Sequence, residues 1–168
     1  MVDNLKRCGI ITSRKVGEVM ETIDRALFVP GGLQPYVDSP MPIGYNATIS
    51  APHMHATCLQ LLEKNLQPGM RALDVGSGIV YELFSLFSAF YAKYSYFGPF
   101  AGTGYLTGCF ALMVGPQGRA VGVEHIPELV SFSIENIKKS AASQSLEDGS
   151  LSVHGGGTVS MISIDMKH

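Results

Sequence analysis

Leu73-Asp74-Val75-Gly76-Ser77-Gly78 decides the fold, because an apolar strand here runs into a glycine turn. A turn of the form Gly-x-Gly-x-x-Gly lets a nucleotide-like ligand approach bare backbone, and the helix that follows points its free N–H groups at that ligand. The expected continuation is missing after Gly78 and resumes only at Thr103-Gly104-Tyr105. Removing the 24 residues 79–102 leaves LDVGSG-TGYLTGCFALMVG, which predicts a continuous strand, turn and helix.

The spacing to a downstream acid supports a ligand site. Glu124 lies 46 residues after Gly78, or 22 residues once the 24 are removed. An acid that binds a ribose hydroxyl is expected about 20 residues beyond such a turn. Gly76 and Gly78 are also compatible with a tight turn that binds nothing, so the spacing of Glu124 carries the prediction.

Composition and charge narrow the class of protein. The 168 residues suit one domain, and a net charge of −2 gives no basic surface for nucleic acid. The three cysteines form no paired pattern, which favours reduced thiols and a cytoplasmic protein. The first residues lack the apolar core of a signal peptide, and no apolar run is long enough to span a membrane. We therefore expect a cytoplasmic monomer with no nucleic-acid or membrane partner.

Periodicity and turn residues predict the remaining elements. Ser13 is a good N-cap, and Pro52 suits the first turn of a helix. Residues 28–46 contain four of the nine prolines and are expected to form a long ordered loop. A polar loop around Glu147 leads to the last strand. The expected helices are 2–8, 14–25, 51–67, 104–114 and 127–139, and the expected parallel strands are 70–75, 120–123 and 151–154.

Several stretches together resemble the protein-L-isoaspartate O-methyltransferases, which methylate isoaspartyl carboxylates with S-adenosylmethionine. They are Tyr36-Val37-Asp38-Ser39-Pro40, Ile43-Gly44, residues 48–56 (TISAPHMHA), residues 73–78 and residues 122–130 (GVEHIPELV). The resemblance implies an α/β, Rossmann-like S-adenosylmethionine-dependent methyltransferase fold from which the C-terminal half of the sheet is missing. It divides a single incomplete domain, 1–168, into a helical and loop region (1–69), three core strands (70–154) and a divergent tail (155–168).

The same resemblance implies roles for individual residues. Ser50 matches the active-site serine, whose hydroxyl orients the carboxylate of isoaspartyl-containing proteins for methyl transfer. That carboxylate is already ionised, so alignment matters more than a strong base. Glu124 is expected to accept from both ribose hydroxyls with its two carboxylate oxygens. The implied cofactor contacts are Thr48, Ile49, Ser50, His55, Asp74, Gly76, Gly78, Gly104, Glu124 and His125.

Simpler interpretations remain open for some of these residues. Ser50 precedes a helix and is as readily explained as its N-cap. His53 and His55 are two residues apart, so on a helix they point in different directions and make a poor metal pair. We expect no metal.

The chain departs from the family pattern at two places. Residues 79–102 hold five phenylalanines and four tyrosines with one acid and one base. This composition is compatible with an aromatic helix on a membrane or partner, but we favour an inserted sequence such as a retained intron, with irregular structure. After residue 154 the acid of the family's next turn and four further strands are missing. Residues 72–75 are then expected to form an exposed apolar edge of the sheet. The alternative to an active methyltransferase is a catalytically inactive isoform that folds only partly or serves as an interaction module.

Overall fold

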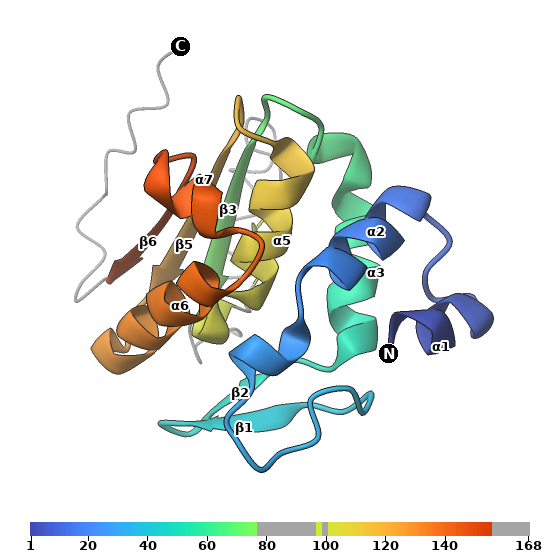
Figure 1. The fold of residues 1–168 in the computed structure, drawn as a ribbon, viewed down its shortest axis with the longest axis horizontal. Helices are drawn as coiled ribbons and strands as arrows, with labels where there is room; N and C mark the ends of the chain where they lie inside the picture. Colours follow the sequence, from blue (N-terminus) through green and yellow to red (C-terminus); the bar gives the residue numbers. More distant parts are fainter. Residues whose placement is uncertain (77–96, 99–100, 156–168) are drawn as a thin grey trace, which may run out of the picture.

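The computed structural model describes residues 1–76, 97–98 and 101–155. Its centre is a four-stranded parallel sheet in the order β4-β3-β5-β6, with helices packed on it and a separate two-stranded hairpin below (Figure 1). The sheet strands are β3 (Arg71–Gly76), β4 (Phe97–Gly98), β5 (Arg119–Glu124) and β6 (Leu151–Gly155). This arrangement is the predicted partial Rossmann-like sheet.

The register of the sheet brings the strand ends together. Gly76 of β3 is paired with Glu124 of β5, and Glu124 is paired with Gly155 of β6. All three residues therefore lie at the carboxyl edge of the sheet. In open parallel sheets this edge is where ligands bind.

Two crossover helices connect the strands. Helix α5 (Tyr105–Val114) contacts β3 and β5, and α6 (Pro127–Lys139) contacts β5 and β6, both on the same side of the sheet (Figure 1). Nine of the ten residues of α5 are buried, because it also packs against the N-terminal helices. In α6, Pro127 stands in the first turn and Lys138 and Lys139 in the last, as helix geometry and the helix dipole favour.

The N-terminal region shares its core with the sheet. Ser13 caps the second helix by accepting a 3.2 Å hydrogen bond from the Val16 N–H, as predicted. The elements are α1 (Val2–Arg7), α2 (Arg14–Thr22), η1 (Arg25–Phe28), α3 (Pro52–Leu62) and η2 (Glu63–Asn65). One hydrophobic cluster includes Val16, Phe28 and Leu59 of this region together with Leu106 and Phe110 of α5.

Two predictions of irregular structure were wrong. The expected loop 28–46 contains β1 (Met41–Gly44), which pairs antiparallel with β2 (Ala47–Ile49). The two-residue turn between them has positive φ at Tyr45 and Asn46, the conformation that tight hairpins require. We missed this strand because we read its prolines as signs of a loop. Proline is tolerated in a strand that has only one partner, as β1 has in β2. The polar loop before β6 likewise contains a short helix, α7 (Ser143–Glu147).

The predicted exposed edge at residues 72–75 was also wrong. Strand β4 pairs with β3 at Leu73 and Asp74, so β3 has neighbours on both sides over that part. Ala72 and Asp74 are buried, at 4% and 0% exposure. The expectation overlooked that residues 97–98 lie beyond the end of β3 in sequence and are able to return beside it. The irregular structure expected for residues 79–102 was wrong where the segment is described, because it contains β4 and the start of the short helix η3 (Ala101–Thr103). The expectations on residues 79–96, and those on the tail 156–168, lie outside the described residues.

Candidate functional site

Glu124 lies at the carboxyl edge of the sheet with a side chain that is almost completely buried. Its Oε1 atom accepts hydrogen bonds from the backbone N–H groups of His125 (2.7 Å) and Ile126 (3.0 Å) and lies 2.9 Å from His125 Nδ1. Oε2 accepts no hydrogen bond from the described residues. Oε1 is thus engaged by backbone N–H groups, and the expectation that both oxygens accept from ribose hydroxyls stays a prediction.

Asp74, next to the end of β3, is fully buried and accepts a 2.6 Å hydrogen bond on Oδ2 from Thr107 Oγ1 of α5. Its Oδ1 has no hydrogen-bond partner within the described part of the chain. Burial raises the pKa of this carboxyl to about 7; the negative charge of Glu124 adds to the rise and the bond from Thr107 opposes it. Asp74 therefore exchanges its proton near neutral pH.

The turn that leads into α5 rests on this same edge. The short helix η3 (Ala101–Thr103) contacts β2, β3, β5 and α6. Gly104 follows with φ +80°, and a Cβ there would lie 3.0 Å from Ile137 Cδ1 and 3.1 Å from Ser133 Cβ. Only glycine meets both demands without strain, as the predicted motif requires.

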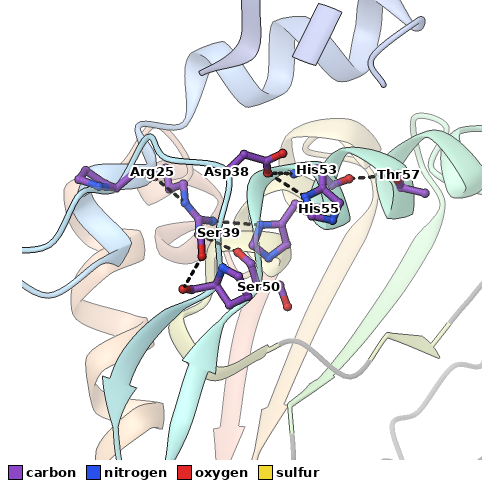
Figure 2. A network of polar contacts seen from close by, with 9 residues as sticks. Arg25, Asp38, Ser39, Ser50, His53, His55 and Thr57 are labelled. Atoms are coloured by element: carbon purple, nitrogen blue, oxygen red, sulfur yellow. Dashed lines mark hydrogen bonds and ion pairs between the residues drawn. The ribbon is translucent and has the colours of Figure 1, made fainter. Parts of the chain in front are cut away.

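Ser50 belongs to a second polar cluster, centred on the buried Arg25 (Figure 2). Arg25 donates from Nη2 to the Ser50 carbonyl oxygen at 2.7 Å and from Nε to the Pro35 carbonyl oxygen at 2.9 Å. Its Nη1 lies 3.1 Å from His55 Nδ1. One side chain therefore joins η1, the loop before the hairpin, the end of β2 and helix α3.

His55 is held in its neutral form by this cluster. A guanidinium only donates, so Nδ1 accepts from Arg25 and the ring proton is on Nε2. Burial lowers the pKa of His55 to about 3, and the positive charge of Arg25 contributes to the fall. The ring also packs against Tyr105 of α5, with centroids 4.9 Å apart. His55 therefore lies between the serine cluster and the crossover helix.

The structure contradicts the interpretation of Ser50 as a helix cap. The N-cap of α3 is Ala51, and no side chain at that position caps the helix. The free N–H of His53 is instead bound by Asp38, whose Oδ1 accepts from both His53 N and His53 Nδ1 at 2.9 Å (Figure 2). Ser50 is half-buried, and its Oγ makes no hydrogen bond to the described residues. Its hydroxyl is thus available for another partner.

The predicted residues therefore form two groups. Ser50 and His55 lie in the Arg25 cluster, beside the exposed Thr48 and the buried Ile49 of β2. The second group lies at the carboxyl edge and consists of Asp74, Gly76, Gly104, Glu124 and the exposed His125. Gly78 lies outside the described residues.

Three residues of these clusters had no predicted role. Arg25 carries no sequence signal, because its contacts are with distant residues. Thr107 stands one turn into α5, and Asp38 is part of a quoted family stretch. Thr107 follows the glycine motif closely enough that inspecting the polar residues near that motif would have identified it as a candidate site residue. Arg25 is far from every motif and would not have been identified in this way.

Metal ligation and membrane spanning find no support in the described residues. No group of three or more His, Cys, Asp or Glu side chains there is arranged to hold a metal ion. Within residues 1–76, 97–98 and 101–155, no helix is long and apolar enough to cross a membrane.

Comparison with known proteins gives consistent results. Protein-L-isoaspartate O-methyltransferase 2 of Arabidopsis thaliana is 62% identical over 156 residues, which cover 93% of this chain and 43% of that protein. The Triticum aestivum protein-L-isoaspartate O-methyltransferase is 60% identical over 154 residues, 92% of this chain and 56% of that protein. The chain thus spans about half the length of these curated relatives.

Solved structures agree with the fold. A Plasmodium falciparum structure described as a protein-L-isoaspartate O-methyltransferase in complex with S-adenosyl-L-homocysteine has a TM-score of 0.73 and 33% identity. The match covers 92% of this chain and 61% of that one. A second structure of that enzyme name, at 20% identity and a TM-score of 0.63, supports the fold alone.

A model of the family described as protein-L-isoaspartate(D-aspartate) O-methyltransferase (PCMT) matches residues 1–94 and 100–161. These ranges include most of residues 79–102 and also residues 155–161, all of which were expected to have no counterpart in the family. The limits of the insertion and of the divergent tail stay a prediction. Since the match covers well over half of the sequence, the chain belongs to the protein-L-isoaspartate(D-aspartate) O-methyltransferase family.

Proposed function

We propose that this protein transfers a methyl group from S-adenosylmethionine to the carboxylate of L-isoaspartyl and D-aspartyl residues in damaged proteins, which initiates their repair. The supporting observation is the alignment of Glu124 with Gly76 at the carboxyl edge of the sheet, beside the turn into α5. Family membership and the S-adenosyl-L-homocysteine bound to the similar Plasmodium falciparum protein add to it.

The residues present fit this cofactor. The Oε2 atom of Glu124 accepts nothing from the described protein groups and suits a ribose hydroxyl. Gly76 and Gly104 have no side chain, so a ligand is able to approach the backbone closely there. The N–H groups at the start of α5 face the same carboxyl edge of the sheet. No metal takes part in the proposed binding of the cofactor. The remaining proposed cofactor contacts are Thr48, Ile49, Ser50, His55, Asp74, Gly78 and His125.

The chemistry asks little of the protein beyond alignment. S-adenosylmethionine supplies a sulfonium-bound methyl group; the carbon–sulfur bond breaks as a bond to the carboxylate oxygen forms, and no proton is transferred. We assign to the Ser50 hydroxyl the role of donating a hydrogen bond to the carboxylate oxygen that does not react. Arg25 holds the Ser50 backbone in place through the carbonyl oxygen, which leaves the hydroxyl free for this contact.

The proposed partners, cellular compartment and oligomeric state rest on the sequence. Isoaspartyl-containing proteins and peptides are the proposed partners, and we propose a cytoplasmic monomer that acts without nucleic acid or membrane. The net charge of −2 supports the absence of nucleic acid. All three cysteines are free thiols, which supports a reducing compartment.

The test is to titrate the full chain with S-adenosyl-L-homocysteine by calorimetry and to follow transfer of a labelled methyl group to an isoaspartyl peptide. The aspartyl form of the same peptide is the substrate control. Glu124→Gln is expected to weaken binding about tenfold or more, because it replaces a charge-assisted hydrogen bond. Glu128→Gln is the matched control, since Glu128 is exposed in the first turn of α6.

Binding and isoaspartyl-specific transfer by the chain would support the proposal. A folded chain that binds S-adenosyl-L-homocysteine but transfers no methyl group would instead support the inactive isoform. Absence of binding in a monodisperse preparation would contradict the proposed function of this chain. The variant lacking residues 79–102 then shows whether these residues are the cause; we expect little recovery, because the chain spans only about half the length of its curated relatives.

A further inference from the structure

Arg25 carries a positive charge in the interior of the protein. The side chain is 0% exposed, and a guanidinium stays protonated in proteins. Among the described residues its hydrogen-bond partners are two backbone carbonyl oxygens and the neutral ring of His55, and its guanidinium carbon lies 5.7 Å from the ring centre of Tyr105. These partners are dipoles and an aromatic face, so they replace water without supplying a negative charge.

The charge of Arg25 is not paired with a carboxylate in the described part of the chain. None of the ion pairs within residues 1–76, 97–98 and 101–155 includes this side chain. Burial lowers the pKa of Arg25 and the negative charge of Asp38 raises it. Asp38 is engaged elsewhere, because its Oδ1 accepts from the His53 N–H and lies 2.9 Å from His53 Nδ1. A buried ion without a close counter-ion is costly, so an anion bound nearby is attracted to it.

The acceptor serine brings such an anion near Arg25. Arg25 Nη2 lies 2.7 Å from the carbonyl oxygen of Ser50 (Figure 2). A carboxylate hydrogen-bonded to the hydroxyl of the same serine would lie within roughly 10 Å of the guanidinium, about the Debye length in 0.1 M salt. Salt screens a pair less where one of its charges is buried. The net charge of −2 gives the chain no general attraction for anions, so any preference for an anion here is local.

We propose that Arg25 is a specificity-determining positioning residue, whose charge makes the acceptor site prefer an ionised carboxylate to a neutral carboxamide. The inference rests on the proposed function, because the carboxylate is that of the isoaspartyl residue at Ser50. The Ser50 hydroxyl alone does not make this choice, since it both donates and accepts and is able to bind an amide as well as a carboxylate. The charge of Arg25 favours only the carboxylate, through space and without contact.

The experiment measures the dissociation constants of two peptides by calorimetry. The full chain is saturated with S-adenosyl-L-homocysteine, so that no methyl group is transferred. One peptide contains an isoaspartyl residue, and its twin has a carboxamide in place of the free carboxylate. We expect the unsubstituted chain to bind the isoaspartyl peptide about tenfold or more tightly than the twin. Equal affinities would overturn the proposal without any variant.

Three variants assign that preference to the charge of Arg25. Arg25→Gln removes the charge and is expected to lower the affinity ratio of the two peptides about tenfold. Arg25→Lys keeps the charge but not the fork of donors, so the ratio should stay within about threefold of that of the unsubstituted chain. Arg14→Gln is the matched control, because it removes a positive charge that is 91% exposed on α2, and the ratio should not change.

The ratio reports charge rather than structure. A shift of the Ser50 backbone weakens the binding of both peptides, whereas loss of the charge weakens the binding of the isoaspartyl peptide alone. Thermal unfolding establishes that each variant is folded. If Arg25→Gln does not fold, Arg25→Lys still decides, since a preference that is lost while the charge is kept would overturn the proposal.

The outcomes separate this inference from the proposed function. A folded chain that binds no isoaspartyl peptide contradicts both. A chain that binds the peptide with a ratio unchanged in Arg25→Gln, or reduced as far in Arg25→Lys as in Arg25→Gln, overturns the role of the Arg25 charge and leaves the proposed function standing.

Discussion

Arg25 Nη2 donates a 2.7 Å hydrogen bond to the carbonyl oxygen of Ser50, across 25 residues of sequence. The bond is to the backbone, so it fixes where Ser50 lies without using its hydroxyl. The same guanidinium contacts His55 Nδ1 (Figure 2). It also donates to the Pro35 carbonyl oxygen and lies 5.7 Å from the ring centre of Tyr105. The position of Ser50 therefore depends on a residue that no motif identified.

Replacing Arg25 with lysine is expected to destabilise the protein. One ammonium group does not reach three separated acceptors, and each buried polar group left unpaired costs about 1–3 kcal/mol. We expect Arg25→Lys to lower the free energy of unfolding by about 2–4 kcal/mol in urea titrations. Arg14→Lys is the control, because the Arg14 side chain is 91% exposed and pairs with Glu18 on the same helix. Equal effects of the two changes would show that the buried cluster contributes nothing.

Ser50→Ala is expected to affect methyl transfer and not folding. The Ser50 hydroxyl makes no hydrogen bond to the described residues, and the carbonyl oxygen bound by Arg25 is retained in alanine. Stability should change by no more than about 0.5 kcal/mol, and S-adenosyl-L-homocysteine binding should be largely unchanged. The rate of isoaspartyl methylation should fall by about tenfold or more, since the acceptor loses its alignment. Ser39→Ala, on the neighbouring loop, should leave that rate unchanged. A loss of stability in Ser50→Ala would restore the structural explanation.

Gly104→Ala is expected to destabilise the turn into α5 through two separable effects. A φ of +80° costs alanine about 1–2 kcal/mol, and overlap with Ser133 and Ile137 adds about 1–3 kcal/mol. Gly149→Ala measures the first effect alone, because Gly149 also has φ +80° and a methyl group added there would have no atom within 4 Å. The difference between the two variants in urea unfolding gives the packing cost. A difference near zero would mean that α6 moves away without cost.

Two buried groups are expected to make opposite contributions to the pH dependence of stability. His55 has a folded pKa of about 3 and an ordinary value of 6.5, so the unfolded chain binds the proton more readily and stability falls as pH drops from 6.5 towards 3. Asp74 has a folded pKa of about 7 and an ordinary value of 3.8, so the folded chain holds the proton and stability falls as pH rises from 3.8 towards 7. Between about pH 4 and 6.5 the two effects oppose each other.

Single variants should reveal each contribution. Asp74→Asn leaves the His55 effect unopposed, so the stability of this variant should rise with pH. His55→Gln leaves the Asp74 effect unopposed, so the stability of that variant should fall with pH. Each slope should differ from that of the unsubstituted chain by at most about 1.4 kcal/mol per pH unit. Urea unfolding from pH 4.5 to 7.5 measures both slopes. Variants whose curves run parallel to that of the unsubstituted chain would show that neither group titrates as assigned.

Much of this protein follows from its sequence because the signals are local. The apolar runs ending at Gly76 and Glu124 predict parallel strands, and proline, glycine and Ser13 mark helix ends through backbone dihedrals and N–H groups close in sequence. The spacing of Glu124 from the turn predicts a ligand site. The structure places Gly76 and Glu124 at the same edge of the sheet, because parallel pairing aligns them.

The tertiary structure alone decided what depends on distant contacts. The neutral state of His55 requires Arg25, 30 residues earlier, and complete burial. Only the packing of Thr103 and Gly104 on α6 places Gly102 beside Glu124. A residue's type limits which bonds it is able to form. Which bonds it does form is set by the groups that folding brings within a few ångströms, and for these residues those groups lie on other elements.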